Sequence, residues 1–226
     1  MTTVYFLRHG AKESGPGDTG LSALGRQQGH ALARRLARRQ IDAIYCSPSM
    51  STWETGVAVA AAHRLPLLFD ARLRERAAWN DPTGQSLADY LAIWQYCNRH
   101  RDQAPPGALS SRQAGARVEH LLQDAHDEYT DTGARDAVIF AISHGATIMD
   151  FLRNVFPLET LARFNSAVYR NPYSSGVLPE ASLTVVHYDG RAYTLSRLGD
   201  SDHLARLFQR PYIPQYTPQL AATMAA

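Results

Sequence analysis

Short apolar runs alternate with amphipathic helical patterns along this chain of 226 residues, and the alternation predicts an α/β fold. Strands that alternate with helices form parallel sheets joined by right-handed crossovers. We therefore expect a three-layer α/β/α sandwich with a mostly parallel, doubly wound sheet. The apolar content of 45% is enough, at this length, for one sizeable core. A single domain over residues 1–226 follows as the expected organisation.

The chain begins with a predicted strand over Val4–Leu7, an apolar run that ends at Arg8 and His9. A loop rich in glycine, proline and aspartate comes next. Leucine and alanine then recur at helical spacing as far as Leu36, and Ser22 can cap the first turn of this helix. Arginines near the end of the helix indicate a solvated outer face rather than a binding patch.

A second strand is predicted from Ile41 to Cys46, and Pro48 ends it because proline cannot donate to a ladder. An alanine-rich helix follows over about residues 49–62. The segment from Leu65 to Glu75 predicts a third short strand and a loop that carries Glu75. Two longer helical patterns come next, at 86–101 and 110–129.

The opening pattern returns at Ala137–Ile142, an apolar run followed by a serine, His144, Gly145 and a helical segment. The chain thus places a histidine followed by a glycine at a strand end twice. Alternating residues that turn at Asp189-Gly190 then predict a hairpin. We expect an irregular tail over about residues 211–226, where prolines interrupt any apolar period.

The composition limits which binding partners and which cellular compartment we expect for this protein. The 23 basic and 21 acidic side chains nearly cancel, so we expect neither nucleic acid nor a membrane as partner. Cys46 and Cys97 lie in no metal-binding spacing, and we expect buried free thiols with no disulfide framework and no metal site. The chain enters its first strand within a few residues and has no apolar run of membrane length, which predicts a cytoplasmic protein.

The two histidines carry the first argument about function. A single histidine at a strand end is more often structural than catalytic. Two of them at equivalent strand ends can meet across the crevice of a doubly wound sheet, where ligands bind, so Arg8, His9 and His144 are expected to face one small volume. Positive charge crowded there favours a neutral imidazole or an anionic guest. A phosphoryl group fits, because its oxygens bind guanidinium and its phosphorus accepts an unprotonated nucleophile.

The motifs also carry a resemblance. "FLRHG", "LSALGRQQGHALARRL", "IYCSP" followed by "ET", "LRE" and "SHGATI" occur in this order. The set resembles the histidine phosphatase superfamily, in its phosphoglycerate-mutase-like branch. The resemblance implies that fold, no cofactor, and a small-molecule phosphate ester as substrate. It implies a segment over about residues 76–131 that caps the pocket.

The same resemblance implies roles for single residues. His9 is expected to be the nucleophile that becomes phosphorylated, and His144 to stabilise the transferring group from the opposite side. Glu75 is expected to be the general acid, although on its own it would be read as a surface glutamate paired with a neighbouring arginine. The resemblance implies that Arg8 holds the phosphate. The expected substrate-binding residues are Arg8, Ser22, Ser51 and Gly145, of which Gly145 leaves room for the phosphate.

The chain departs from the family at two motifs. Ser51 stands where the family carries a second phosphate-binding arginine, so one bidentate contact is missing. Arg72, Arg74 and Arg112 are candidates to replace it. After Gly10 the chain has Ala11 and Lys12. Lys12 is either a positive charge at the mouth of the pocket or a solvated loop residue, so we leave it out of the catalytic set.

Substrate choice stays open at this stage. Trp79, Tyr90, Trp94 and Tyr96 could stack on a substrate, but aromatic residues at helical spacing are more often core. The loop at 169–180 is a second candidate wall. The expected function is hydrolysis of a small phosphomonoester through a phosphohistidine. A mutase, or an impaired family member that binds a phosphorylated ligand or partner, remains the alternative, a metallohydrolase is disfavoured, and a homodimer is left open.

Overall fold

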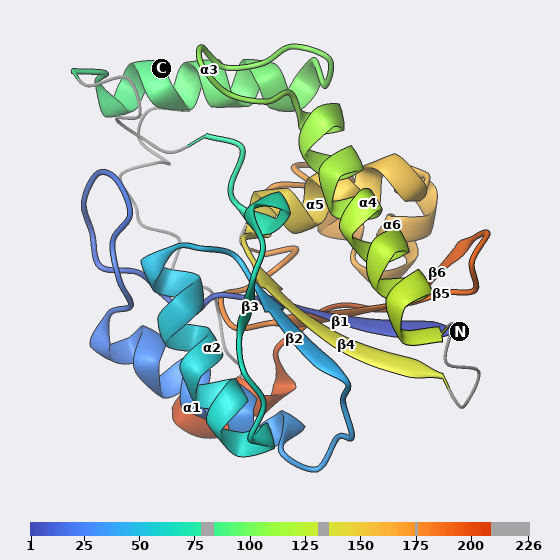
Figure 1. Cartoon of the computed structure of the whole chain (residues 1–226). Helices are drawn as coiled ribbons and strands as arrows, with labels where there is room; N and C mark the ends of the chain where they lie inside the picture. The colour runs from blue at the N-terminus through green and yellow to red at the C-terminus, as the bar shows by residue number, and fades with distance from the viewer. Residues whose placement is uncertain (78–83, 131–135, 175, 209–226) are drawn as a thin grey trace.

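The computed structural model describes residues 1–77, 84–130, 136–174 and 176–208, so the expected tail at 211–226 lies outside the described residues. A six-stranded sheet in the order β3-β2-β4-β1-β5-β6 forms the centre of these ranges (Figure 1). The strands from β3 to β1 are parallel, and β5 and β6 are antiparallel to their neighbours. With helices on both faces, the predicted three-layer α/β/α sandwich is confirmed (Figure 1).

The elements follow the predicted order. The strands are β1 Thr2–Arg8, β2 Ala43–Cys46, β3 Leu68–Phe69, β4 Ala137–Ser143, β5 Leu183–Tyr188 and β6 Tyr193–Asp200. The helices are α1 Ala23–Leu36, α2 Met50–His63, α3 Leu87–Arg99, α4 Ser111–Thr130, α5 Gly145–Val155, α6 Leu158–Phe164 and α7 Ala205–Phe208, with a 3-10 turn η1 at Ala71–Leu73. None of the helices in the described ranges combines the length and the apolar character needed to cross a membrane.

Local chemistry sets the boundaries of these elements. The hydroxyl of Ser22 accepts a hydrogen bond of 3.1 Å from the backbone N–H of Gly25, which caps α1 as predicted. Between β5 and β6 the carboxylate of Asp189 accepts the N–H groups of the next turn, and Gly190 takes a φ of 92° that favours glycine. The predicted hairpin is therefore confirmed at its predicted turn.

Successive side chains of β1 point to opposite faces of the sheet and belong to two separate hydrophobic cores. Phe6 packs with Phe151 of α5, their ring centroids 5.2 Å apart, on the face covered by α4, α5 and α6. Leu7 points to the other face, where it belongs to the core formed by Leu32 of α1 and Val59 of α2. This alternation fixes the register of β1 and hence the direction in which its carboxyl end presents the next residues.

Helix α3 stands apart from the sheet, at the top of Figure 1, and among its residues only Cys97 is buried. The hydroxyl of Ser86 caps it by accepting a hydrogen bond of 3.1 Å from the N–H of Asp89. Cys46 and Cys97 are both free and buried, as the sequence predicted. Within the segment at about 76–131 that we expected to cover the pocket, α3 is an exposed helix joined to the sheet by loops, whereas α4 belongs to the hydrophobic core beside α5. Residues 78–83 of that segment lie outside the described ranges.

Candidate active site

Two neighbouring strands deliver a pair of histidines to the same edge of the sheet. Arg8, the last residue of β1, pairs in register with Ser143, the last residue of β4. His9 and His144 therefore follow side by side, and their ring centroids are 5.2 Å apart with an interplanar angle of 65°. Both rings are buried, each only 7% exposed. The structure brings together the two histidines that the sequence pattern predicted to meet.

A backbone carbonyl fixes the tautomer of His9. Its Nδ1 atom lies 2.7 Å from the carbonyl oxygen of Gly10, which can only accept, so Nδ1 carries the proton. Burial and the charge of Arg8 lower the pKa of His9 to about 3. At neutral pH the ring is an uncharged imidazole whose Nε2 lone pair is available as a nucleophile.

A third strand end supports His144. Ser47 follows β2, and its hydroxyl lies 2.9 Å from Nε2 of His144. Burial and the neighbouring His9 hold the pKa of His144 well below its usual value. Ser47 was not among the predicted site residues, although its place at the end of a buried strand, before Pro48, is the same signal that singled out the histidines.

Arg8 lies against the loop at 169–180 that the sequence offered as a second wall. One terminal nitrogen donates to the backbone carbonyl of Leu178, and the other donates to Glu180 at 3.1 Å. Its Nε atom is buried and has no hydrogen-bond partner among the described residues. Gly145 leaves room for this side chain, because a Cβ at that position would lie 3.1 Å from Nε of Arg8.

Glu75 follows η1 and points to the start of α5. Its Oε1 atom accepts a hydrogen bond of 2.9 Å from the hydroxyl of Thr147. Burial, and next the charge of Asp150, raise the pKa of Glu75. The carboxyl therefore keeps its proton at higher pH than an exposed glutamate, which suits a group that donates a proton. It is not paired with Arg72, whose guanidinium binds Asp70 and Asp124.

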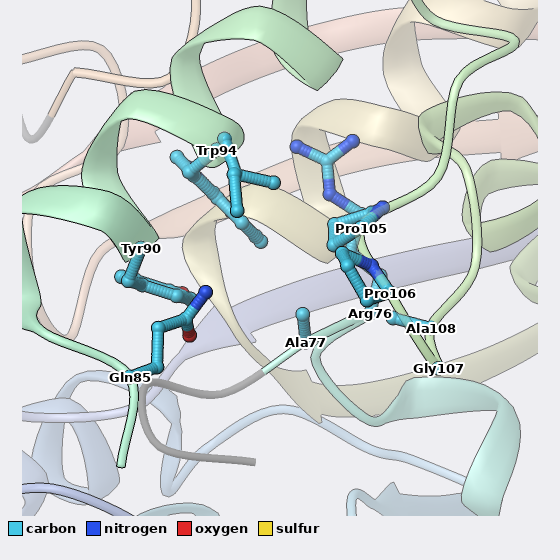
Figure 2. A pocket seen from close by; sticks show the side chains of 10 residues that line it. Arg76, Ala77, Gln85, Tyr90, Trp94, Pro105, Pro106, Gly107 and Ala108 are labelled. Atoms are coloured by element: carbon cyan, nitrogen blue, oxygen red, sulfur yellow. The ribbon is translucent and has the colours of Figure 1, made fainter. Parts of the chain in front are cut away.

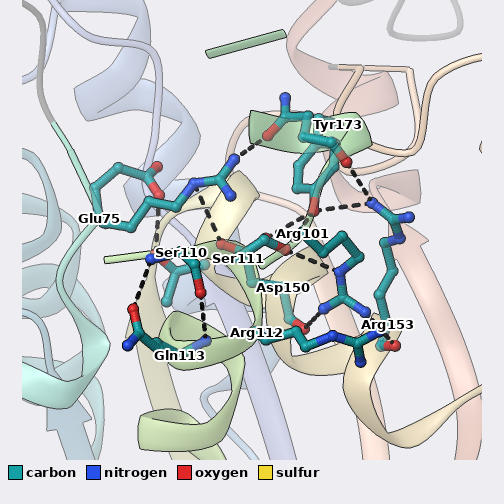
Figure 3. Close-up of polar contacts among 12 residues, drawn as sticks. Glu75, Arg101, Ser110, Ser111, Arg112, Gln113, Asp150, Arg153 and Tyr173 are labelled. Atoms are coloured by element: carbon teal, nitrogen blue, oxygen red, sulfur yellow. Dashed lines mark hydrogen bonds and ion pairs between the residues drawn. The ribbon is translucent and has the colours of Figure 1, made fainter. Parts of the chain in front are cut away.

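A buried cluster of polar side chains lies next to Glu75 (Figure 3). We call it the Asp150 cluster. The Oδ1 atom of Asp150 accepts hydrogen bonds from Ser111 at 2.6 Å and from Tyr173 at 2.7 Å, and its Oδ2 atom lies 3.6 Å from Nε of Arg76. Asp150 and the side chain of Arg76 are fully buried. Since the charge of Asp150 raises the pKa of Glu75, the Asp150 cluster affects the protonation of Glu75 as well as joining α4 to α5. Its members are Arg76, Arg101, Ser111, Asp150, Arg153 and Tyr173.

A cavity of about 380 Å³ lies between α3, the loop at 105–108 and the chain at Arg76 and Ala77 (Figure 2). Among the described residues, its wall includes neither Glu75 nor the two histidines. The guanidinium of Arg76 lies 4.2 Å from the ring centroid of Trp94, and Tyr90 stacks on Trp94 at 5.7 Å. Tyr90 and Trp94 thus line the cavity, whereas Tyr96 is exposed, and Trp79 lies outside the described residues. Figure 2 labels the wall residues Arg76, Ala77, Gln85, Tyr90, Trp94, Pro105, Pro106, Gly107 and Ala108.

The remaining predicted positions lie around the loop after His9. Ser51 is fully buried in the first turn of α2, and its hydroxyl has no hydrogen-bond partner among the described residues. Thr55, one turn later, accepts the N–H of Gly10 at 3.1 Å. Ser22 donates to the carbonyl of Ala11 at 3.1 Å, so its hydroxyl holds this loop as well as capping α1. Of the candidates to replace an arginine at 51, Arg72 is engaged as above, and Arg112 pairs with Asp102 at 2.8 Å.

A sheet of this order with paired histidines at its carboxyl edge has the architecture of the histidine phosphatases. The family model for the histidine phosphatase superfamily (branch 1) matches residues 4–201, and the chain belongs to that family. The glucosyl-3-phosphoglycerate phosphatase of mycobacteria, solved with inorganic phosphate, superposes with a TM-score of 0.70 at 24% identity, over 90% of this chain and 99% of that one.

Similar proteins with assigned names include phosphatases and a phosphoglycerate mutase. A protein of Hydrogenobacter thermophilus, provisionally named phosphoserine phosphatase 2, is 23% identical over 92% of this chain and 100% of its own length. A glucosyl-3-phosphoglycerate phosphatase of Mycolicibacterium vanbaalenii is 32% identical over 64% of this chain and 70% of its own. An Escherichia coli protein named probable phosphoglycerate mutase is 26% identical over 85% of this chain and 97% of its own.

Proposed function

We propose that this protein hydrolyses a small organic phosphomonoester, without a metal ion, through a phosphohistidine formed on His9. One observation carries the proposal. The Nδ1 atom of His9 lies 2.7 Å from the Gly10 carbonyl oxygen, so Nδ1 holds the proton and Nε2 is unprotonated. The ring is positioned at a rigid strand end, and its centroid lies 5.2 Å from that of His144. The named phosphatases among the relatives support the same reaction class.

In the first step, the lone pair of His9 Nε2 attacks phosphorus and the ester P–O bond breaks. The Glu75 carboxyl gives its proton to the leaving alkoxide oxygen, and its raised pKa keeps that proton in place beforehand. Arg8 binds oxygens of the phosphoryl group, and His144 stabilises the charge that spreads over them in the transition state.

In the second step, Glu75 is a carboxylate and removes a proton from water as the water oxygen attacks phosphorus. The P–N bond breaks, its electron pair returns to Nε2 of His9, and inorganic phosphate leaves. The enzyme ends in its starting state, with Glu75 protonated again. Since imidazole supplies the nucleophile and a carboxyl supplies the proton, the cycle balances without any metal.

The cavity between α3 and the loop at 105–108 is where we place the leaving group of the substrate. Arg76 and Ala77, which follow Glu75 in the sequence, line it, and Trp94, Tyr90 and Arg76 give it a mixed aromatic and cationic wall. Its volume of about 380 Å³ suits a small organic alcohol rather than a macromolecule. A small-molecule phosphate ester is therefore the partner that we propose.

The test is phosphate release from an aryl phosphate and a panel of sugar, nucleoside and amino-acid phosphates in excess chelator. We compare the wild type with His9→Ala, and use His120→Ala, which removes an exposed histidine on α4, as the matched control. The wild type and the control should turn over and form a base-stable phosphoenzyme at His9, seen by mass spectrometry after a rapid quench. Turnover that survives in His9→Ala, or that stops in chelator, would contradict the proposal.

A mutase is the second candidate, because a relative of that name covers most of the chain. It shares the phosphohistidine and differs only in the acceptor. Incubation of the phosphoenzyme with excess product alcohol separates the two: a phosphatase releases inorganic phosphate, whereas a mutase returns the phosphoryl group to the alcohol. Tight binding of phosphate esters with no turnover of any substrate would instead favour an impaired member of the family.

A further inference from the structure

The chain contains a single lysine. Of its 23 basic side chains, 22 are arginines, and the exception is Lys12, two residues after the Gly10 that fixes His9. The lysine stands on the loop that follows His9, and its side chain is exposed. The salt bridges among the described residues do not include it.

The site is short of positive charge for the ligand that we propose. A phosphomonoester carries a charge of about −2 at neutral pH, like other phosphate esters of second pKa near 6. Arg8 is next to the histidines, but one of its two terminal nitrogens is bound to Glu180. Ser51 contributes no charge. A second cation is needed to bind the dianion well, and the structure has to supply it from another position.

The backbone around Lys12 is held firmly. Lys12 forms a β-bridge with Leu21, whose N–H donates to Glu54 of α2 at 2.8 Å. The N–H of Ala11 donates to Gln28 of α1 at 2.8 Å. Helix α1 packs against this loop so closely that a Cβ on Gly25 would lie 2.0 Å from the carbonyl oxygen of Ala11. The backbone at Lys12 is therefore held in place, while its side chain remains flexible.

The positive charge of Lys12 affects both histidines of the site. The charge of Lys12 lowers the pKa of His9 and of His144, and for His144 its influence exceeds that of Arg8. Lys12 is exposed and lies three residues after His9 on the loop held by the bridge to Leu21, so its charge acts on both rings. Arg117 acts on His144 as well, but it donates to the backbone carbonyl of Arg74 and belongs to the side of Glu75.

We propose that Lys12 is the second phosphate-binding cation of this enzyme, taking the place of the arginine that the family carries at position 51. The inference rests on the proposed function. The lysine ammonium binds a non-bridging oxygen of the phosphoryl group from the mouth of the pocket, while Arg8 binds another from the wall formed by Leu178 and Glu180. A point charge on a flexible stem suits this position, because it can follow the phosphoryl group during transfer.

The first test compares Lys12→Met with Lys12→Arg, and uses Arg34→Met, which removes an exposed cation in the last turn of α1, as the matched control. Inorganic phosphate is the probe, with its dissociation constant measured by calorimetry and its inhibition constant by turnover of an aryl phosphate. Loss of one charge-assisted contact should weaken phosphate binding about ten- to one-hundred-fold in Lys12→Met. Lys12→Arg should stay within a few-fold of the wild type, and Arg34→Met should match it.

The second test uses the fact that the lysine is unique. Reductive methylation with ¹³C-formaldehyde labels the lysine and the α-amino group of Met1, which pairs with Asp136. Dimethylation preserves the positive charge. On titration with inorganic phosphate, the lysine signal should shift and saturate at the dissociation constant found by calorimetry, while the signal of Met1 should stay constant.

The outcomes separate the inference from the proposed function. If the wild type hydrolyses phosphomonoesters and Lys12→Met binds phosphate as tightly as the wild type, the inference is wrong and the proposed function stands. Equal losses in Lys12→Met and Lys12→Arg, or a lysine signal that ignores phosphate, would also overturn the inference. If the wild type neither binds phosphate nor forms a phosphohistidine, the proposed function fails first.

Discussion

Glu180 accepts a hydrogen bond of 3.1 Å from a terminal nitrogen of Arg8, so a carboxylate binds the arginine that we propose as a phosphate ligand. The residues are 172 positions apart and meet because β5, which follows Glu180, runs antiparallel beside β1. The pair lowers the net charge beside the histidines. Its presence means that an incoming phosphoryl group competes with a resident anion for Arg8.

Glu180→Gln should therefore strengthen phosphate binding. Removal of one negative charge at this distance, in a partly buried site, should lower the inhibition constant of inorganic phosphate by about three- to ten-fold. Inhibition of aryl phosphate turnover measures it, with Glu159→Gln, an exposed glutamate on α6, as the control for net charge. An unchanged or higher inhibition constant would mean that Glu180 orients Arg8 more than it opposes the ligand.

The buried His9 should make the fold sensitive to acid. Its pKa is about 3 in the native protein and about 6.5 in an unfolded chain, so the unfolded state binds one more proton between these values. The contribution to stability is complete above about pH 6.5 and is lost as the pH falls toward about 3, at about 1.4 kcal/mol per pH unit. His9→Asn should flatten the fall in the free energy of unfolding by about that slope near pH 5.

Urea unfolding at several pH values measures this slope, and His120→Asn provides the exposed control on α4. Because the pKa of His144 is also held low, His9→Asn should reduce the acid sensitivity without abolishing it. Identical slopes for the wild type and His9→Asn would show that the pKa of His9 is not lowered in the native state.

Much of the fold follows from local patterns. The runs at Val4–Leu7 and Ala137–Ile142 are almost continuously apolar because helices cover both faces of the sheet, and the structure has β1 and β4 there. The strand-end histidines could be predicted to meet because parallel strands share a carboxyl edge. These inferences need only sequence-local information and a rule of topology.

The rest of the site depends on contacts that no local pattern encodes. Glu75 stands out in the sequence only through the family resemblance, since the hydrogen bond of Thr147 and the charge of Asp150 that act on it come from more than 70 residues away. Leu178 and Glu180 meet Arg8 across the sheet in the same way. The loop that carries Lys12 is held by the β-bridge to Leu21, a contact that no local pattern predicts.

Glu75→Gln should slow hydrolysis according to the leaving group. A positioned general acid contributes about 10²- to 10⁴-fold, so alkyl phosphates should lose that factor while aryl phosphates with good leaving groups should lose little. In the wild type the rate of phosphoenzyme formation from an alkyl phosphate should fall as the pH rises through the raised pKa of Glu75, because the carboxyl must be protonated to act.

Thr147→Val provides the matched variant for this assignment. The hydroxyl of Thr147 lowers the pKa of Glu75, so its removal should raise that pKa and move the basic limb of the alkyl phosphate profile to higher pH. Stopped-flow measurement of the first turnover against pH checks both variants. If Glu75→Gln leaves alkyl phosphates untouched, the proton donor is another group.

Gly145→Ala should separate stability from binding. Gly145 opens α5, and alanine is the better helix former there, so the free energy of unfolding should stay unchanged or rise slightly. The new Cβ, however, would lie 3.1 to 3.3 Å from three atoms of the Arg8 side chain, which would have to move away from its place beside the histidines. Phosphate affinity should fall several-fold while the melting temperature stays unchanged.

Gly29→Ala is the control. The atom nearest to its new Cβ would lie 3.7 Å away, so the change should stabilise α1 by about 0.5–1 kcal/mol and leave phosphate binding unchanged. Equal phosphate affinity in Gly145→Ala and Gly29→Ala would mean that the phosphoryl group is bound without Arg8 in its observed place.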